Sequence, residues 1–265
     1  MRSHSSGATQ RAAAGFGTCC LNIDGVRFVY GGAPAHQMTP WDGRNALTAV
    51  RLLFSNIDQL RATFRPETRI QEIITEGGTA SNVVPDRAVA DFYIRYPDAA
   101  YLKQVRAMVD DAAHAAALAT GTKVLIDNCG QMRDGIATGS LNEVAFAYLK
   151  KYGGTKVQEE KGKPQGFEET GSVSSDIPGV GFSAHSSNGG NHTFEMEADA
   201  LTDVGHSGFL VDAQAMTALL YDFATNADYR AAVAKEFANT KGLFGEYQRA
   251  LEKAYAVPTV AEPKK

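Results

Sequence analysis

Residues 88–127 read AVADFYIRYPDAAYLKQVRAMVDDAAHAAALATGTKVLID. Their first eight residues alternate between two faces, which is typical of a half-buried strand. Asp98 is placed to cap a long helix, and Thr120-Gly121 is placed to end it. A second strand is expected over residues 123–127. The apolar side chains of the predicted helix share one stripe, formed by Leu102, Val105, Met108, Val109, Ala112 and Ala116.

The segment before this stretch supplies the other half of a repeated pattern. A strand is expected over residues 26–30, where Gly31-Gly32-Ala33-Pro34 ends it. A helix is expected from Asp42, which we place as its N-cap, and a further strand over residues 69–75. The resulting order over residues 22–127 is β-α-β-β-α-β, the split βαβ or ferredoxin-like arrangement.

Beyond Asp127 the spacing of apolar residues is less regular, so the elements are harder to predict. Helices are expected over residues 141–152, 208–225 and 229–239, with a short strand over 180–184. These elements cannot close a two-layer α/β domain by themselves, because the sheet lacks strands. The first fifteen residues show no periodicity and are expected to be poorly ordered. The predicted organisation is a disordered leader (1–20), the split βαβ domain (21–130), part of an incomplete α/β domain (131–245) and a tail (246–265).

The composition of the chain excludes several classes of partner. The chain has 26 Lys and Arg against 30 Asp and Glu, a net charge of −4, and no long block of either sign. Nucleic acid and acidic membranes are therefore not expected partners. No stretch is apolar enough to be a membrane span. The spacing of the three cysteines matches no zinc ribbon or disulfide framework, so a reducing cytoplasm is the expected location.

Several local motifs stand in a suggestive order: VYGGAPAHQMTPWDGRNAL, IITEGGTASNVVPDRA, FYIRYPD, Ser174-Ser175-Asp176 and Asn191-His192-Thr193. Together, from about Leu21 to Phe237, they resemble the dizinc peptidases and amidohydrolases that include aminoacylases, carboxypeptidase G types and p-aminobenzoyl-glutamate hydrolases. The p-aminobenzoyl-glutamate hydrolase and aminoacylase-like branch is the most similar. The resemblance implies an α/β (α+β) fold in which the β-α-β-β-α-β unit is a dimerisation, or lid, domain inserted into a catalytic domain.

The resemblance also implies a metal site with two zinc ions, most of whose ligands precede the lid. No such ligand motif precedes Leu21, so we expect a chain truncated at its N-terminus that is inactive alone. His192 is the late ligand that the match retains, with His206 a second candidate. One histidine cannot hold zinc, because a catalytic site needs about three protein ligands. A separate chain could carry the missing half.

Two further roles, those of His36 and Asn82, follow from the resemblance, whereas Arg95 is a candidate because of its place at the end of a strand. His36 would reach the site of a second protomer and stabilise the tetrahedral oxyanion. Asn82 would bind the substrate carboxylate or the same oxyanion, and Arg95 is a candidate for carboxylate binding. A homodimer formed through edge strands of the two lids is expected. His185 and His114 are expected to be structural.

Two other functions, a serine hydrolase and a dinucleotide-binding protein, do not fit the motifs of the chain. A serine hydrolase is rejected because neither Ser174 nor Ser175 lies in a Gly-x-Ser-x-Gly elbow. Gly31-Gly32 and Gly77-Gly78 lack the spacing of a dinucleotide fingerprint. The alternative that stays open is a non-catalytic dimerisation module or remnant. If the chain serves catalysis, its substrates would be N-acyl amino acids, small peptides or p-aminobenzoyl-glutamate-like amides.

Overall fold

The computed structural model describes residues 2–7, 12–15, 17–18, 20–153, 157–160 and 169–263. The chain divides into two compact units. The ferredoxin-like unit contains residues 21–132 and 248–265, and the mixed-sheet unit contains residues 1–20 and 133–247. Each unit has its own sheet and its own hydrophobic core.

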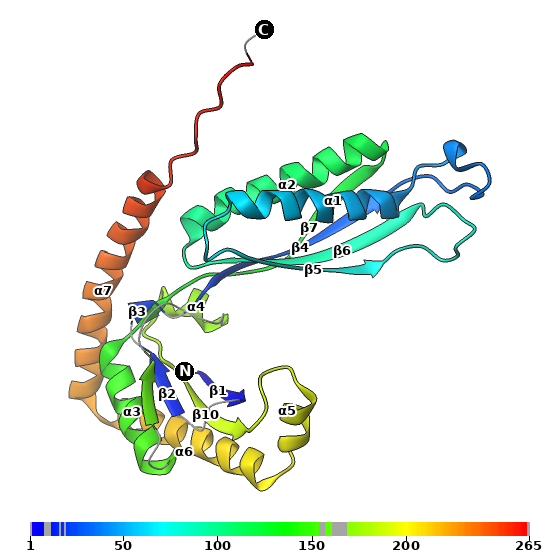
Figure 1. Ribbon diagram of the computed structural model, residues 1–265. Helices are drawn as coiled ribbons and strands as arrows, with labels where there is room; N and C mark the ends of the chain where they lie inside the picture. The colour runs from blue at the N-terminus through cyan, green and yellow to red at the C-terminus, as the bar shows by residue number, and fades with distance from the viewer. Residues whose placement is uncertain are drawn as a thin grey trace. The chain divides into compact units, whose positions relative to one another are not determined.

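The ferredoxin-like unit confirms the predicted order of elements. Its helices α1 (Ala46–Leu60) and α2 (Ala99–Thr120) cover one face of a four-stranded sheet (Figure 1). The strands are antiparallel in the order β5-β6-β4-β7, so the central strand β4 pairs with both β6 and β7. Their bounds are β4 Asn22–Gly31, β5 Arg69–Glu76, β6 Arg87–Tyr96 and β7 Lys123–Met132.

The core of this unit lies between the sheet and the two helices. Val26, Phe28 and Tyr30 alternate along β4 and are fully or almost fully buried. Phe28 meets Phe92 edge to face with ring centroids 5.2 Å apart, and Phe54 of α1 meets the same ring at 5.4 Å. Such pairs stabilise a core beyond the area that they bury, by about 0.5–1.5 kcal/mol each. The periodicity of two in the strands therefore decides which sheet face the helices cover.

The helix ends show one correct prediction and one error. Asp98 caps α2 by accepting a hydrogen bond from the amide of Tyr101, and Gly121 ends the helix with a φ of 65°. The predicted N-cap Asp42 is wrong, because residues Pro40–Asp42 form a short 3-10 turn, η1, instead. Asn45 caps α1 by accepting from the amide of Thr48. A second 3-10 turn, η2 (Arg61–Thr63), follows α1.

The C-terminal residues of the ferredoxin-like unit are not a free tail from residue 246, as the sequence predicted. Helix α7 extends over Ala227–Ala254, and Tyr255 packs on the core after it. The Tyr255 ring lies 5.4 Å from that of Tyr101, and its hydroxyl donates to Asp98 Oδ2 at 3.0 Å. The Arg65 guanidinium lies over the same ring, 4.4 Å from its centroid. Burial of Tyr255 raises its pKa.

The mixed-sheet unit contains strands that the sequence did not reveal. Its sheet has the order β1-β10-β2-β9, with β1 parallel to β10, β10 antiparallel to β2 and β2 parallel to β9. The prediction of a disordered leader is therefore wrong for β1 and β2, which supply the strands that the α/β region was thought to lack. Their sequences, RSHSSG and AAAG, carry no apolar alternation, yet backbone pairing does not require one. The strands are β1 Arg2–Gly7, β2 Ala12–Gly15, β9 Val157–Glu160 and β10 Gly181–Ser187, and β3 Gly17–Thr18 pairs with β8 Ile136–Ala137 separately.

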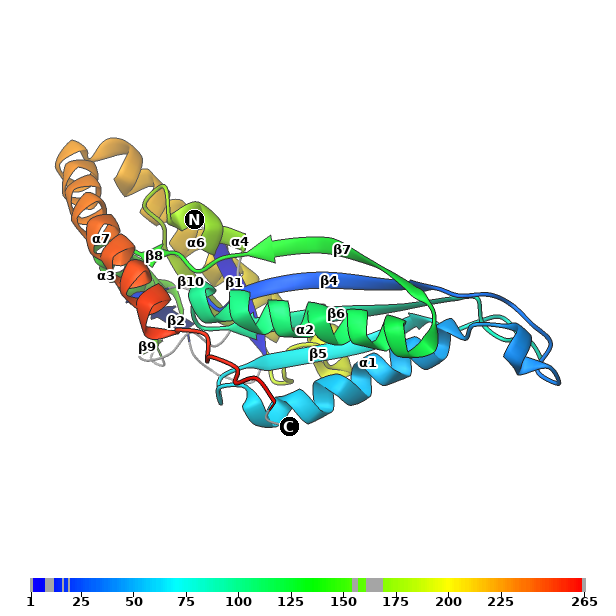
Figure 2. The same cartoon turned by 90° about the horizontal axis from the view of Figure 1, so that it is seen from above.

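Helices of the mixed-sheet unit pack on one another and on β10. The core joins buried side chains of α3, β10, α6 and α7, among them Leu149, Phe182, Leu219 and Val233. Figure 2 shows the same elements from above. The helices are α3 Gly139–Gly153, α4 Glu169–Ser174, α5 Phe194–Asp199, α6 Asp203–Thr225 and α7.

Glu236 of α7 caps the N-terminus of α3. Its two carboxylate oxygens accept hydrogen bonds from the amides of Gly139 and Ser140 at 2.7 and 2.9 Å. Burial by itself would raise the pKa of Glu236, but these hydrogen bonds outweigh burial and lower it. A carboxylate at a helix N-terminus satisfies amides that lack intrahelical partners and also faces the positive end of the helix dipole.

In the part of the chain that the structure describes, no helix is long and apolar enough to cross a membrane. Cys129 is a free, exposed thiol, whereas the buried Cys20 is disulfide-bonded, which the cysteine spacing did not predict.

The C-terminal contact should stabilise the ferredoxin-like unit. Tyr255→Ala removes a ring from the aromatic cluster and a donor from Asp98, so we expect a loss of about 1–3 kcal/mol in local stability. Hydrogen exchange of the α2 and β6 amides will measure it. Val257→Ala is the matched control, since Val257 is 74% exposed. Equal protection in the two variants would show that the contact has no stabilising role.

The Glu236 cap predicts a pH dependence of stability. Because its folded-state pKa lies below the unfolded value of roughly 4.3, the cap contributes fully above that pH and is lost as pH falls through the folded-state pKa. Glu236→Ala should cost about 1 kcal/mol at neutral pH, with the gap to wild type narrowing below about pH 4. Urea unfolding at several pH values tests this, with Glu246→Ala, an exposed position on the same helix, as control. A gap that stays constant with pH would contradict the assignment.

Candidate functional site

Two loops meet at one end of the ferredoxin-like unit and form what we call the tip, residues 32–45 and 77–86. His36 and Val83 form an isolated antiparallel bridge across it. The amide of Gln37 donates to the Asn82 carbonyl at 3.0 Å, and that of Val84 to the Ala35 carbonyl at 2.8 Å. The tip is thus held together mainly by backbone hydrogen bonds, with one further contact from the Gln37 side-chain amide to the Val83 carbonyl at 3.5 Å.

A glycine permits this close approach. A Cβ atom on Gly32 would lie 2.0 Å from the carbonyl oxygen of Arg44, which no real side chain could tolerate. Gly32, which directly follows β4, is therefore needed for the return of the first loop, whereas a Cβ atom on Gly31 would meet no atom within 4 Å. The Ala33–Arg44 bridge closes the base of that loop.

His36 is exposed and has a defined hydrogen-bonding pattern. Its Nδ1 accepts a hydrogen bond from the amide of Met38 at 3.1 Å. In a neutral imidazole one nitrogen accepts and the other carries the proton, so this contact assigns the proton to Nε2. His36 can therefore present an N–H donor to a ligand without first gaining a proton.

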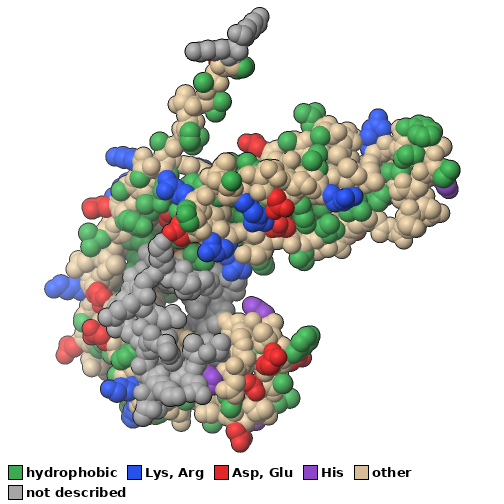
Figure 3. All heavy atoms as spheres, viewed as in Figure 1, with side chains coloured by type: hydrophobic (Ala, Val, Ile, Leu, Met, Phe, Trp, Pro, Cys, Tyr) green, Lys and Arg blue, Asp and Glu red, His purple; other side chains and the backbone are tan. Residues whose placement is uncertain are grey.

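The structure brings two of the three predicted lid residues together. Asn82 is exposed beside the His36–Val83 bridge, so its side-chain amide and the imidazole belong to the same tip. Large apolar side chains stand with them, since Met38 is 76% and Trp41 71% exposed. Figure 3 shows hydrophobic side chains gathered with a histidine at this end of the unit.

Arg95 lies elsewhere. It is near the far end of β6, eight residues from Arg87 at the tip end, which corresponds to about 26 Å of strand. There it pairs across the sheet with Arg69, and its guanidinium lies 5.8 Å from the centroid of the Tyr93 ring. The fold therefore does not join Arg95 to His36 and Asn82.

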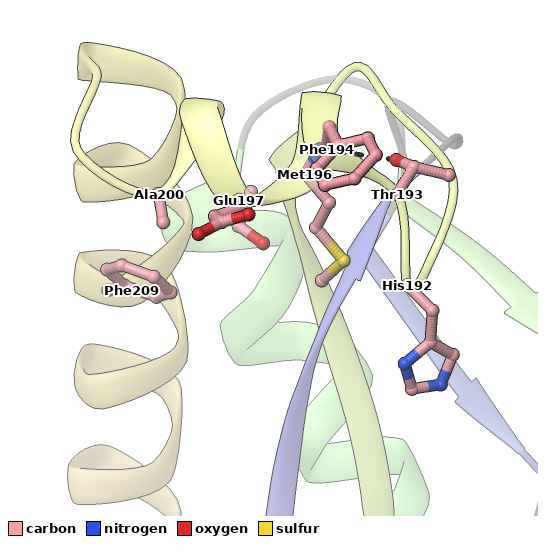
Figure 4. Close-up of a pocket in the computed structure, with 8 residues that line it drawn as sticks. His192, Thr193, Phe194, Met196, Glu197, Ala200 and Phe209 are labelled. Carbon is pink, nitrogen blue, oxygen red and sulfur yellow. Dashed lines mark hydrogen bonds between the residues drawn. The ribbon is translucent and has the colours of Figure 1, made fainter. Parts of the chain in front are cut away.

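The mixed-sheet unit has a cavity of about 560 Å³ around the start of α5 (Figure 4). This volume is within the range of small-molecule sites. Glu197 is the one acidic side chain among its described lining residues, and His192 stands at its edge. The other lining residues are small or apolar: Ser186, Thr193, Phe194, Met196, Ala200 and Phe209.

His192 has an unusual backbone. Its φ is +63°, and among the described residues it is the non-glycine position with a positive φ. Thr193, next to it, caps α5 by accepting from the amide of Met196 and donates to the Gly190 carbonyl at 2.8 Å. A histidine in the left-handed region is uncommon and is held there by the turn on one side and the helix cap on the other. The imidazole itself is exposed.

Asp199 anchors the loop that leads to His192. Its Oδ2 accepts hydrogen bonds from the amide of Asn188 at 2.7 Å and from the hydroxyl of Ser187 at 3.0 Å. These bonds, the one from Asn188 first, lower the pKa of Asp199. The end of β10 is thereby tied to the end of α5.

The remaining sequence candidates do not join His192 in a metal site. His206 is exposed on the first turn of α6, and His185 is half-buried on β10 with its Nδ1 lacking a hydrogen-bond partner. In the described part of the chain, no three His, Cys, Asp or Glu side chains are grouped so that they could hold a metal ion. These residues therefore do not fit a zinc site by themselves. Asp176 of the Ser-Ser-Asp motif instead forms a surface ion pair with Lys241.

Sequence patterns alone missed the residues that shape the cavity. Ser186 and Glu197 line it and Asp199 fixes its loop, yet none of the three was singled out from the sequence. The Gly189-Gly190-Asn191 turn and the Thr193 cap were the available signals, because together they mark a loop returning onto a helix.

Comparisons with known proteins agree with this architecture. Residues 21–120 match the family model described as the peptidase dimerisation domain, so this part of the chain carries that domain. The curated Xaa-Arg dipeptidase of Mus musculus is 32% identical over 156 residues, which are 57% of this chain and 36% of the relative. The chain thus spans little more than a third of that relative's length.

Solved structures show the same fold at low identity. A hydantoinase/carbamoylase family amidase from Burkholderia vietnamiensis matches with a TM-score of 0.62 and 15% identity, over 81% of this chain and 53% of that one. An aminobenzoyl-glutamate utilization protein from Klebsiella pneumoniae matches with a TM-score of 0.52 and 16% identity, over 78% and 53%. Both likenesses support the α/β architecture of the two units.

The loop anchor at Asp199 can be tested directly. Asp199→Ala leaves the Asn188 amide and the Ser187 hydroxyl without their acceptor, so the Asn188 amide should exchange on the order of tenfold faster. Hydrogen exchange read by NMR measures this amide. Asp203→Ala, at an exposed position in the first turn of α6, is the control. Unchanged exchange at Asn188 would show that the loop is fixed by other contacts.

Proposed function

We propose that this chain serves a metal-dependent amidohydrolase or peptidase that cleaves an amide bond, with the ferredoxin-like unit acting as its dimerisation and lid domain. The observation that carries the proposal is the tip: His36 accepts the Met38 amide at Nδ1, which leaves Nε2 for a ligand, and it stands beside Asn82 on a loop pair closed by backbone hydrogen bonds. The match of residues 21–120 to the peptidase dimerisation domain supports it.

The chemistry of the tip suits the transition state of amide hydrolysis. When water attacks the carbonyl carbon, negative charge develops on the carbonyl oxygen, and a preorganised N–H donor stabilises that charge. His36 Nε2–H would supply this donor in the site of a second protomer. The Asn82 amide can donate to the same oxygen or to a carboxylate of the substrate.

A homodimer is proposed to form through the edge strand β5. Ile73 and Ile74 on this strand are 62% and 43% exposed. An edge strand with exposed apolar side chains tends to pair with another strand, so β5 is a suitable dimer contact. Antiparallel pairing of β5 with its symmetry mate would be isologous, because each strand would contribute the same surface.

The metal site is proposed to be shared. His192 would be one zinc ligand, and the resemblance suggests two zinc ions in an intact site. The other ligands would come from outside the described residues, for instance from a separate chain that carries the remaining metal-binding half. The cytoplasm is the proposed location.

Substrates are proposed within one chemical class: N-acyl amino acids, small peptides and p-aminobenzoyl-glutamate-like amides. A place in the aminoacylase and p-aminobenzoyl-glutamate hydrolase branch is part of the proposal. The 32% identity to a protein named Xaa-Arg dipeptidase favours short peptides within this class. The second candidate function is a non-catalytic dimerisation module, which the absence of a grouped metal-ligand set among the described residues favours.

Complementation separates the two functions. A full-length relative of this hydrolase class, whose own lid histidine is replaced by alanine, is mixed with the purified chain and assayed on N-acyl amino acids and dipeptides. The wild-type chain should restore turnover, and the His36→Ala chain should restore about 100-fold less, since one oxyanion donor contributes on the order of 10²–10³ in kcat.

Sedimentation of the same samples tells binding from catalysis. A dimer without recovered turnover would establish the dimerisation module and refute the catalytic proposal. Ile73→Asp should prevent the dimer, whereas Leu118→Asp, at an 85% exposed position of α2, should not. A wild-type chain that stays monomeric at micromolar concentration would contradict both functions.

A further inference from the structure

Helix α6 has an outward side without charge. Its inner side contributes to the core of the mixed-sheet unit, next to the strand β10 (Figure 1). Over residues 204–225, all of which the structure describes, the charged side chains are Asp212 and Asp222. Asp212 is buried, and Asp222 accepts a hydrogen bond from the Tyr148 hydroxyl. Neither acid therefore supplies charge to the outward side of these residues.

Apolar side chains take the place of charge on that side. Leu210, Leu220 and Tyr221 are each more than half exposed, and Phe209 is 44% exposed. Helix α7 of the same chain is different, because exposed lysine, arginine and glutamate residues are spread along it. A helix that is apolar on both sides is normally buried on both sides. The outward face of α6 therefore marks a site of contact with another molecule.

This face is arranged symmetrically about Ala215, which lies in the core. Residues at equal distances before and after Ala215 are of the same kind. The pairs are Phe209 with Tyr221, Leu210 with Leu220, and Ala213 with Thr217. With 3.6 residues per turn, all of them point within about 60° of one direction, and Ala213 and Thr217 lie at its centre.

We propose that the outward face of α6 pairs with the same face of a second copy of this chain, with the two helices antiparallel. A two-fold axis opposite Ala215 places each residue against its mirror counterpart, so Leu210 faces Leu220 of the second copy. The small side chains of Ala213 and Thr217 at the crossing allow the helix axes to approach to about 8 Å. Large side chains then fill the space on both sides of the crossing.

Other occupants fit the face less well. A helix that lies on a membrane surface has lysine and arginine on its polar side, and α6 contains neither. A different protein would require no mirror symmetry in the face. A two-fold pair of identical helices does require it, because each residue and its counterpart must both suit the contact.

The pairing is separate from the one through β5, because β5 belongs to the ferredoxin-like unit and α6 to the mixed-sheet unit. The inference therefore does not rest on the proposed function. One pair of helices buries less than the roughly 1,200 Å² of a standard interface, so we expect a dissociation constant on the order of 10⁻⁴ M. Since Phe209 also lines the cavity beside His192, Tyr221 of the second copy would border that cavity.

Sedimentation equilibrium of the 265-residue chain at about 5 µM and about 500 µM tests the pairing. The average mass should rise toward twice its value at the lower concentration. The Ile73→Asp chain, which lacks the β5 contact, should pass from monomer toward dimer, and the wild type from dimer toward a larger assembly. This readout of mass requires neither metal nor turnover.

A charge at the centre of the face should prevent the rise in mass. Thr217→Lys and Ala213→Glu each bury an unpaired charge between identical helices, so each should weaken association by roughly tenfold or more. Thr225→Lys is the matched control, because Thr225 is exposed on the same helix about 100° from the centre of the face. Ala213 and Thr217 are exposed as well, so none of these changes should disturb folding.

Mixing the two charged variants tests the antiparallel register. In a pair made of one Thr217→Lys chain and one Ala213→Glu chain, the introduced lysine faces the introduced glutamate. The equimolar mixture should therefore regain the association that each variant alone has lost, and added salt should weaken it.

Three outcomes would overturn the inference. They are a mass that does not rise up to about 500 µM, a rise that survives Thr217→Lys, and a mixture of the charged variants that stays dissociated. The proposed function fails separately, in the complementation assay.

Discussion

The pairing of β4 with both of its neighbours is the constraint on which the ferredoxin-like unit depends. Because β4 lies between β6 and β7, its side chains alternate between the helix-covered face and the open face from Val26 onward, beyond a register irregularity with β7 between Asp24 and Val26. Phe28 then faces the helices and meets Phe92, while Arg27 on the opposite face pairs with Asp91 at 2.7 Å. A shift of one residue would exchange these two environments. The register of β4 also sets where the chain leaves the sheet, and so where the tip begins.

Elements that bury a regular face could be predicted from the sequence, and elements held by backbone alone could not. The stripe of α2 and its Asp98 cap predicted that helix to within a residue. The strands β1 and β2 were missed because short runs of Ser, Ala and Gly give no alternation, although they pair with β10. The Asp42 cap failed for a local reason: Pro40 favours a separate tight turn, which leaves the helix start to Asn45.

The residues of the candidate site also divide into those that the sequence could predict and those that it could not. His36 and Asn82 were found because each stands in a distinctive motif, and the fold places them on one tip. Arg95 was chosen on residue type at the end of a strand, and the strand direction takes it away from that tip. Glu197 could not be found, because a glutamate on a short surface helix looks like any solvated charge in a sequence. Only the packing of α5 against β10 and α6 turns it into part of a cavity wall.

The way the tip is built determines what substitutions there can reveal. Its two loops are joined by main-chain hydrogen bonds, from Gln37 to Asn82 and from Val84 to Ala35, and by the close approach that Gly32 allows. Among the described residues, the imidazole of His36 receives a hydrogen bond from the amide of Met38 and contacts no other part of the fold through hydrogen bonds. Replacing either His36 or Asn82 therefore removes chemistry while leaving the loops in place. A change at Gly32 would do the opposite, because it would displace the histidine without altering it. The two kinds of variant together can distinguish a donor that acts on a substrate from a loop that merely shapes a dimer.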